Sequence, residues 1–202
     1  MKLYDFPLSG NCYKVRLMLS FLDIPAQTQQ VELAQGQQRS PDFLALNPLG
    51  QVPVVQDGDI TLHDSNAILI YLTARYDIGG HWLPKQPEKL AQLISWLSLA
   101  SNEIANGPAA LRLVRLFNAS LDIERAQTLS KTVCNLLEHK LSHQAWLLEG
   151  AEPSVADVAC YPYLALSGDG GWSLETFPAI RGWLTRFETL PRFVPLLAES
   201  VV

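Results

Sequence analysis

The spacing of apolar residues differs between the two parts of the chain that meet near residue 80, and this difference restricts the available folds more than any other feature. In residues 1–77, short apolar runs of strand length alternate with amphipathic stretches of helix length, in the order β-α-β-α-β-β-α. From residue 88 onward only helical spacing remains. The intervening residues, 78–87, contain two glycines and two prolines, which is typical of a linker. We therefore predict an α/β domain over residues 1–77, a linker over 78–87 and an all-helical domain over 88–202.

Four helices are predicted in the second domain, at residues 88–106, 122–148, 154–166 and 177–190. At the start of the third, Ser154 and Asp157 fit a capping box, in which each side chain accepts a hydrogen bond from the other residue's amide. We interpret Asp157 as a folding signal without a catalytic role. Arg112 and Arg115 are expected to be solvated.

Composition and charge exclude several classes of protein. The 202 residues are 48% hydrophobic, enough to build compact cores, and the net charge of −5 argues against a nucleic-acid partner. No apolar run approaches the roughly 18 residues that a membrane span needs, and Asp5 and Lys14 interrupt the region where an export signal would lie. The three cysteines lack metal-site or disulfide spacing. We expect a cytoplasmic protein that binds no nucleic acid, membrane or metal.

The turn after the first predicted strand carries a group of small polar residues, Ser9-Gly10-Asn11-Cys12. Amides at the start of the following helix, together with the Ser9 hydroxyl and the Asn11 amide, suit a small anionic group such as a thiolate. The alternative is that Ser9 and Asn11 only cap the helix. Cys12 is interpreted as a small, partly buried residue, because a disulfide motif would need a cysteine in place of Ser9.

Two further motifs follow in the same domain. The Val52-Pro53 bond opens a predicted strand and is a candidate cis peptide, which would leave the Val52 backbone available to an extended, peptide-like ligand. Alternatively, Pro53 only protects an edge strand. Asp64 and Ser65 lie at a predicted helix N-terminus, where they suit the two charges of an amino-acid head group or form a simple cap. Together, the three motifs favour a short peptide with a central thiol and a free α-amino acid end.

With these motifs the chain resembles the cytosolic glutathione S-transferases, in particular a serine-type, theta- or phi-like bacterial class. The resemblance covers essentially all of the chain and rests on four segments, at residues 9–11, 47–53, 64–68 and 154–158. It implies a thioredoxin-like N-terminal domain and an all-helical C-terminal domain that contributes the electrophile pocket. It also implies a homodimeric detoxification enzyme in which glutathione, the co-substrate, attacks a small hydrophobic electrophile.

The resemblance also implies a role for each motif residue. Ser9 would donate a hydrogen bond to the glutathione sulfur with Asn11 beside it, and which of the two dominates is left open.

Five positions would hold the rest of glutathione. Gln51 and the Val52 backbone would bind the cysteinyl-glycine portion next to a cis Pro53. The pair Asp64-Ser65 would bind the γ-glutamyl end, and Arg39 would bind the glycine carboxylate, for which a planar guanidinium is well suited.

Two alternatives to a transferase are considered. In a glutathione-dependent peroxidase or disulfide reductase, the bound thiolate would attack oxygen or sulfur instead of carbon. A non-catalytic, transferase-like binding module would keep the fold without the chemistry. The pair Asp64-Ser65 argues against the second alternative, because a scaffold has no need of a site for a zwitterion.

Overall fold

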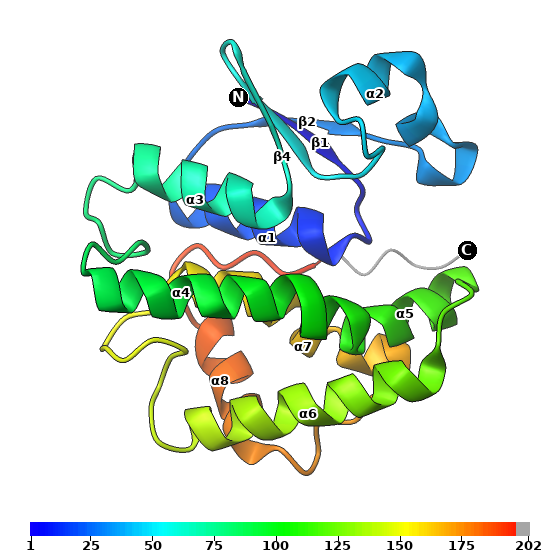
Figure 1. Cartoon of the computed structure of the whole chain (residues 1–202). Helices are drawn as coiled ribbons and strands as arrows, with labels where there is room; N and C mark the ends of the chain where they lie inside the picture. Colours follow the sequence, from blue (N-terminus) through cyan, green and yellow to red (C-terminus); the bar gives the residue numbers. More distant parts are fainter. Residues whose placement is uncertain (197–202) are drawn as a thin grey trace. The chain divides into compact units, whose positions relative to one another are not determined.

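The computed structural model describes residues 1–196, which form two compact units (Figure 1). The first unit comprises residues 1–78 together with the described part of the C-terminal segment that starts at Pro191, and the second comprises residues 79–190. The pattern of the sequence predicts the segment from Pro191 as part of the helical domain. In the structure, the Tyr13 hydroxyl donates a hydrogen bond to the Val194 carbonyl at 2.7 Å, and the Ser20 hydroxyl donates one to the Arg192 carbonyl at 2.7 Å. These bonds explain why this segment belongs to the first unit.

The first unit is a four-stranded sheet with three α-helices, in the predicted order. Its elements are β1 (Lys2–Asp5), α1 (Gly10–Phe21), β2 (Gln27–Gln30), α2 (Pro41–Leu46), β3 (Val54–Asp57), β4 (Ile60–His63) and α3 (Ser65–Tyr76). The strand order is β2-β1-β3-β4; β1 and β2 are parallel, whereas β3 is antiparallel to both β1 and β4. This arrangement confirms the predicted thioredoxin-like fold.

Both faces of the sheet are covered. Phe43 of α2 packs with Tyr4, Val31 and Val54. Because side chains alternate along a strand, the neighbouring paired residues Leu3 and Val55 point to the opposite face, where they are buried. Helices α1 and α3 lie side by side beneath the sheet in Figure 1. Helix α1 follows β1 and helix α3 follows β4, and a hydrogen bond between Ser65 and Asn11 shows that the N-termini of the two helices lie close together.

Every regular element described in the second unit is helical, as predicted. The helices are α4 (Pro87–Leu99), which continues into a π-helical turn at Ala100–Ile104, α5 (Pro108–Phe117), α6 (Ile123–Leu141), α7 (Val155–Ala165) and α8 (Pro178–Glu188). Helix α5 was not predicted, because Gly107-Pro108 was interpreted as a break. In the structure Pro108 occupies the first turn of α5, where its missing N–H costs nothing. Helix α6 ends at Leu141, earlier than the predicted residue 148. The apolar residues 146–148 are buried, but they are not helical.

Two side chains of the second unit clarify its packing. The capping box at the start of α7 is present: the Asp157 carboxylate accepts from the Ser154 amide at 2.9 Å, and the Ser154 hydroxyl accepts from the Ala156 amide. The prediction that Arg112 is solvated is wrong. Arg112 is buried and pairs with Asp169 at 2.8 Å, because the turn Ser167–Gly170 folds back over α5. Within residues 1–196, no helix has both the length and the apolar character needed to cross a bilayer.

Candidate active site

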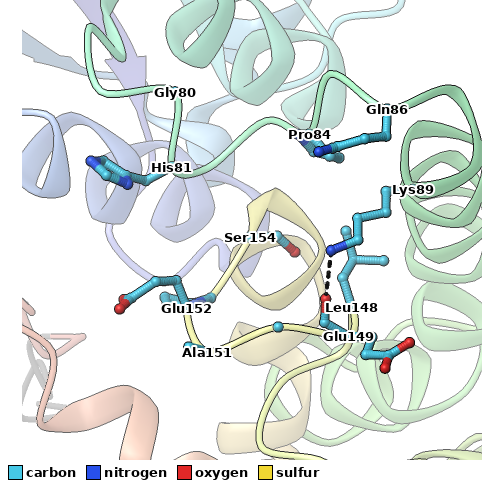
Figure 2. A pocket seen from close by; sticks show the side chains of 12 residues that line it. Gly80, His81, Pro84, Gln86, Lys89, Leu148, Glu149, Ala151, Glu152 and Ser154 are labelled. Atoms are coloured by element: carbon cyan, nitrogen blue, oxygen red, sulfur yellow. Dashed lines mark hydrogen bonds between the residues drawn. The ribbon is translucent and has the colours of Figure 1, made fainter.

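The second unit contains a cavity of about 220 Å³ that is separate from the predicted site (Figure 2). It lies between residues 80–89 and residues 148–154, and two of its lining residues are joined by a hydrogen bond of 3.0 Å from the Lys89 ammonium to the Glu149 carbonyl. Its ionisable side chains, which include His81, Lys89 and Glu152, carry both signs of charge. None of the predicted site residues lines this cavity.

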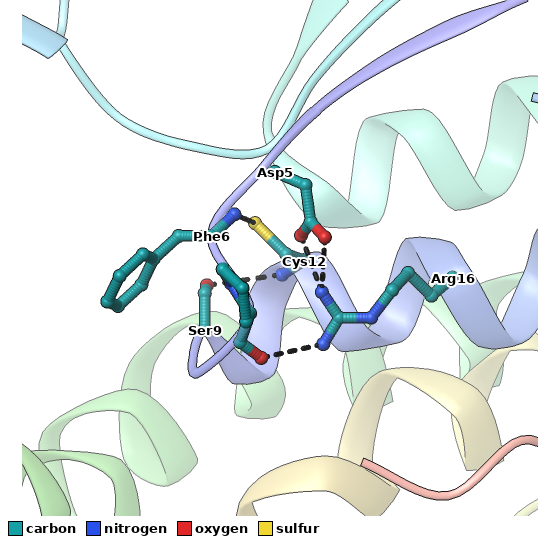
Figure 3. Close-up of polar contacts among 6 residues, drawn as sticks. Asp5, Phe6, Ser9, Cys12 and Arg16 are labelled. Atoms are coloured by element: carbon teal, nitrogen blue, oxygen red, sulfur yellow. Dashed lines mark hydrogen bonds and ion pairs between the residues drawn. The ribbon is translucent and has the colours of Figure 1, made fainter. Parts of the chain in front are cut away.

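The predicted thiol site lies in the first unit, where Ser9 caps α1 (Figure 3). The Ser9 hydroxyl oxygen accepts a hydrogen bond from the Cys12 amide at 3.2 Å, and the Ser9 amide donates to the Phe6 carbonyl at 2.9 Å. The amides of Gly10 and Asn11, the first two of α1, donate to no acceptor among residues 1–196. Ser9 therefore stands beside two available donors at the positive end of a helix dipole.

Cys12 is unsuited to act as a nucleophile. It is fully buried, more deeply than the sequence analysis expected, and its sulfur accepts a hydrogen bond from the Phe6 amide at 3.4 Å. Burial, and after it the nearby Asp5 carboxylate, raises the pKa of the Cys12 thiol to about 12. Since only a thiolate reacts readily, this thiol is inert at neutral pH. Any sulfur chemistry at the Ser9 turn therefore requires a sulfur supplied by a ligand.

The structure brings together two motifs that lie 54 positions apart in the sequence. The Ser65 hydroxyl donates a hydrogen bond to the Asn11 side-chain oxygen at 3.3 Å. Ser65 is the first residue of α3 and is buried, whereas Asn11 lies in the first turn of α1. This bond connects the N-termini of two helices, both of which favour negative charge.

Asp64 caps α3 in an unusual backbone conformation. Its Oδ1 accepts a hydrogen bond from the Ala67 amide at 2.9 Å, its φ is 71°, and its side chain is exposed. Positive φ values are rare outside glycine and store local strain, which is found most often at functional sites. The other carboxylate oxygen, Oδ2, has no partner among residues 1–196. Asp64 can therefore cap α3 and still accept from a ligand's ammonium group.

The predicted Val52-Pro53 cis peptide bond is present. The Val52 amide and carbonyl make no hydrogen bond within residues 1–196, so this backbone is available to an extended ligand. Sequence analysis missed the residue that holds the loop. Asn47 is buried; its Nδ2 donates to the Gln51 carbonyl at 2.8 Å, and its Oδ1 accepts from the Leu49 amide at 3.0 Å. A polar residue directly before a Pro-x-Gly turn was the available signal for such a role.

Arg39 lies next to the same loop. It ends a 3₁₀ turn at Gln37–Arg39 and is exposed. Its Nη1 is only 3.2 Å from the position that a Cβ atom on Gly50 would occupy, and Gly50 has a φ of +61°. A glycine at position 50 thus allows both the turn and the close approach of the guanidinium. Arg39 is thereby placed beside Gly50, directly before Gln51.

The comparisons with known proteins identify the family of the chain. Residues 1–74 match the family model described as "Glutathione S-transferase, N-terminal domain". Human glutathione S-transferase theta-1 is 32% identical over 197 residues, which cover 93% of this chain and 82% of that protein. The crystal structure of a glutathione S-transferase from Pseudomonas fluorescens Pf-5 has a TM-score of 0.88 and 33% identity, covering 97% of this chain and 98% of that one.

A third similar structure contains a ligand. The glutathione transferase homologue from Drosophila mojavensis, crystallised with bound glutathione, has a TM-score of 0.85 and 25% identity, covering 94% of this chain and 88% of that one. The identity with human theta-1 and the cover of both chains are sufficient to assign the family. The chain belongs to the cytosolic glutathione S-transferase family and is an enzyme of that family.

Proposed function

We propose that the enzyme binds glutathione on its first unit, holds the sulfur as a thiolate at the Ser9 turn and directs it at small hydrophobic electrophiles. The observation that carries the proposal is the hydrogen bond from Ser65 to Asn11, because it joins the predicted thiol site to the predicted γ-glutamyl site. Glutathione in the Drosophila mojavensis homologue supports the same ligand here.

Each end of glutathione has matching groups in the proposed site. The ammonium of the γ-glutamyl end would meet the free oxygen of Asp64, while its carboxylate would meet the N-terminus of α3 at Ser65. The cysteinyl backbone would pair with the Val52 amide and carbonyl next to Pro53, with Gln51 beside it. The glycine carboxylate would accept from the guanidinium of Arg39.

The Ser9 turn has a modest energetic task. A free thiol has a pKa of about 8.5, and lowering it by about two units requires about 2.7 kcal/mol of preferential binding of the thiolate. Hydrogen bonds to a charged acceptor contribute about 1.5–3 kcal/mol each. One or two donors among the Ser9 hydroxyl, the Asn11 side chain and the amides of Gly10 and Asn11 are therefore sufficient.

The chemistry is then a nucleophilic displacement or addition. The thiolate donates an electron pair to an electrophilic carbon and forms a carbon–sulfur bond; a leaving group, where there is one, departs with its own bonding pair. The protein contributes thiolate stabilisation and proximity. We expect the helical unit to select the electrophile, and the enzyme to act in the cytoplasm.

We also propose that the enzyme is a homodimer. Leu90 and Ile94, one turn apart on α4, are 38% and 50% exposed, and such a stripe supports helix packing between two copies. Light scattering after gel filtration tests this: a mass near 45 kDa, twice the 22.4 kDa of one chain, is expected, and 22.4 kDa would contradict it.

Turnover with a panel of co-substrates tests the proposed function. Glutathione is supplied with aryl halides, organic peroxides or mixed disulfides, and the products are identified by mass spectrometry. We expect thioethers from the aryl halides, with turnover strongly reduced in Ser9→Ala. Turnover confined to peroxides or mixed disulfides would replace the proposal with thiolate attack on oxygen or sulfur. Absence of turnover and of glutathione binding would contradict it entirely.

A further inference from the structure

A single arginine ties together the three segments that form the Ser9 turn (Figure 3). Arg16, in the second turn of α1, contacts both oxygens of Asp5, the last residue of β1, at 2.5 and 2.6 Å through Nη1. Its Nη2 donates to the Pro7 carbonyl at 2.9 Å. One guanidinium therefore joins the end of the strand, the loop and the helix. We call this arrangement of Asp5, Pro7 and Arg16 the turn clamp.

The turn clamp is well shielded from solvent. The Asp5 side chain is 6% exposed and that of Arg16 is 23% exposed. Charge-assisted hydrogen bonds in such a setting are short, strong and weakly screened by salt. The planar guanidinium also fixes the direction of each bond, which a lysine ammonium would not do. The clamp thus has the rigidity that a positioning element needs.

We propose that Arg16 is a positioning residue for the Ser9 hydroxyl, holding the strand end and the loop so that this hydroxyl meets the glutathione sulfur. The inference rests on the proposed function, because it requires Ser9 to act on that sulfur. Residues 6–9 have no regular secondary structure, so their path depends on a few specific bonds. The Ser9 amide donates to the Phe6 carbonyl, and Arg16 fixes the adjacent Pro7 carbonyl. Within residues 1–196 the hydrogen bonds of the Arg16 guanidinium go to Asp5 and Pro7 and not to Ser9, so Arg16 acts through the loop.

Positioning and simple charge effects predict opposite results for one substitution. If the clamp acted only through its charges, removing the negative charge of Asp5 would stabilise the nearby thiolate, and the bound thiol would ionise at lower pH. If the clamp positions Ser9, Asp5→Asn weakens the bond to Arg16, loosens the turn, and the bound thiol ionises at higher pH. The sign of the Asp5→Asn effect therefore separates the two explanations.

The experiment titrates the thiol of bound glutathione, using the ultraviolet absorbance of the thiolate, and measures glutathione affinity by calorimetry. In Arg16→Met we expect ionisation to shift upward by about one pH unit, which is a tenfold fall in the ratio of thiolate to thiol at a fixed pH. The dissociation constant should stay within about threefold of that of the unmodified enzyme, because the groups that bind the two ends of glutathione are untouched.

A second variant, Arg16→Lys, keeps the positive charge but lacks the two separate guanidinium nitrogens that contact Asp5 and Pro7. Its bound thiol should also ionise at higher pH, and this variant replaces Arg16→Met in the experiment if Arg16→Met does not fold. Arg181→Met, an exposed arginine of α8, is the matched control and should titrate like the unmodified enzyme.

A double variant separates failure of this inference from failure of the proposed function. In the Ser9→Ala background, Arg16→Met should add almost no shift, because the group that it positions is gone. A full shift in that background, or a downward shift in Asp5→Asn, would overturn the positioning role while leaving the proposed function intact. If Ser9→Ala alone leaves the titration unchanged, the assignment of Ser9 is wrong and the positioning role is rejected with it.

Discussion

Trp183 donates its indole N–H to the Asp157 carboxylate at 3.0 Å, inside the core of the helical unit. The same carboxylate accepts from the amides of Ser154 and Leu147 at 2.9 and 3.0 Å. The capping residue therefore also joins α8 and the segment before α7 to the start of that helix. Burial raises the pKa of this carboxyl, and the hydrogen bonds partly offset the rise.

We predict that Asp157→Ala lowers the free energy of unfolding by on the order of 3 kcal/mol, because it leaves several buried donors without an acceptor. Urea titration followed by circular dichroism measures this. Glu152→Ala, an exposed acid on the same loop, is the control and should change stability by less than about 0.5 kcal/mol. A loss below about 1 kcal/mol in Asp157→Ala would show that the donors find other partners.

The capping box was predictable from the sequence because it is local: a serine and an aspartate three positions apart are enough. The bonds from Trp183 and Leu147 to the same carboxylate were not predictable, since 26 and 10 positions separate the partners and no spacing rule connects them. The prediction that Arg112 is solvated was wrong for the same reason, because its partner Asp169 lies 57 positions away.

The same distinction holds in the candidate site. Strand and helix periods predicted the order of elements in the first unit, and the motif residues at 9–11, 52–53 and 64–65 could be named from local chemistry. The Ser65–Asn11 bond and the Asp5–Arg16 pair depend on how α1, α3 and β1 pack, which only the folded chain reveals. The roles of the site residues stay predictions.

A pH-dependent contribution to stability is expected from Asp57. Hydrogen bonds from Tyr76, at 2.5 Å, and Tyr71, at 2.8 Å, lower the pKa of this carboxyl from its ordinary 3.8. A pKa that is lower in the folded state means that the stabilisation is present above the ordinary value and is lost as the pH falls through the folded value. Asp57→Asn should therefore destabilise the protein at pH 7 and have a smaller effect at about pH 3, below the ordinary value.

Urea titrations at the two pH values measure this dependence. Asp59→Asn, an exposed acid in the same hairpin, is the matched control and should have little effect at either pH. An equal loss for Asp57→Asn at both pH values would contradict the assignment, because it would show that the carboxylate charge is not involved.

The charge and the capping function of Asp64 can be separated. Asp64→Asn keeps an oxygen that can accept from the Ala67 amide but removes the negative charge. We expect this variant to melt close to the unmodified protein and yet to lose retention on immobilised glutathione, because the γ-glutamyl ammonium is left unpaired. Asp42→Asn, in the first turn of α2, is the control. Undiminished retention of Asp64→Asn would remove Asp64 from the proposed site.

Asn47 should control the loop that carries Gln51 and Val52. Asn47→Asp keeps the oxygen that accepts from the Leu49 amide but loses the donor to the Gln51 carbonyl. We expect its glutathione affinity, measured by calorimetry, to fall by about tenfold, corresponding to about 1.4 kcal/mol. Asn118→Asp, at the end of α5, serves as the control. An unchanged affinity would mean that the loop keeps its conformation without this bond.

The thiols of the three cysteines should not react with thiol reagents in the native protein. All three are buried, and burial raises the pKa of Cys12 to about 12 and also raises that of Cys134. We expect a colorimetric thiol reagent to detect none of them at pH 8 in the native protein and all three in urea. Cys12→Ala should retain turnover. Fast reaction of a thiol in the native protein, with loss of activity on its modification, would indicate that a protein sulfur takes part in catalysis.

The Ser9 turn is proposed to stabilise the thiolate of bound glutathione, and a pH titration of that thiol in the complex is the decisive measurement. In the unmodified enzyme the bound thiol should ionise about two pH units below the free value of about 8.5. Ser9→Ala should bind glutathione with similar affinity but ionise it at clearly higher pH. An unchanged titration in Ser9→Ala would contradict the claim, and a shift seen only in Asn11→Ala would transfer the role to Asn11.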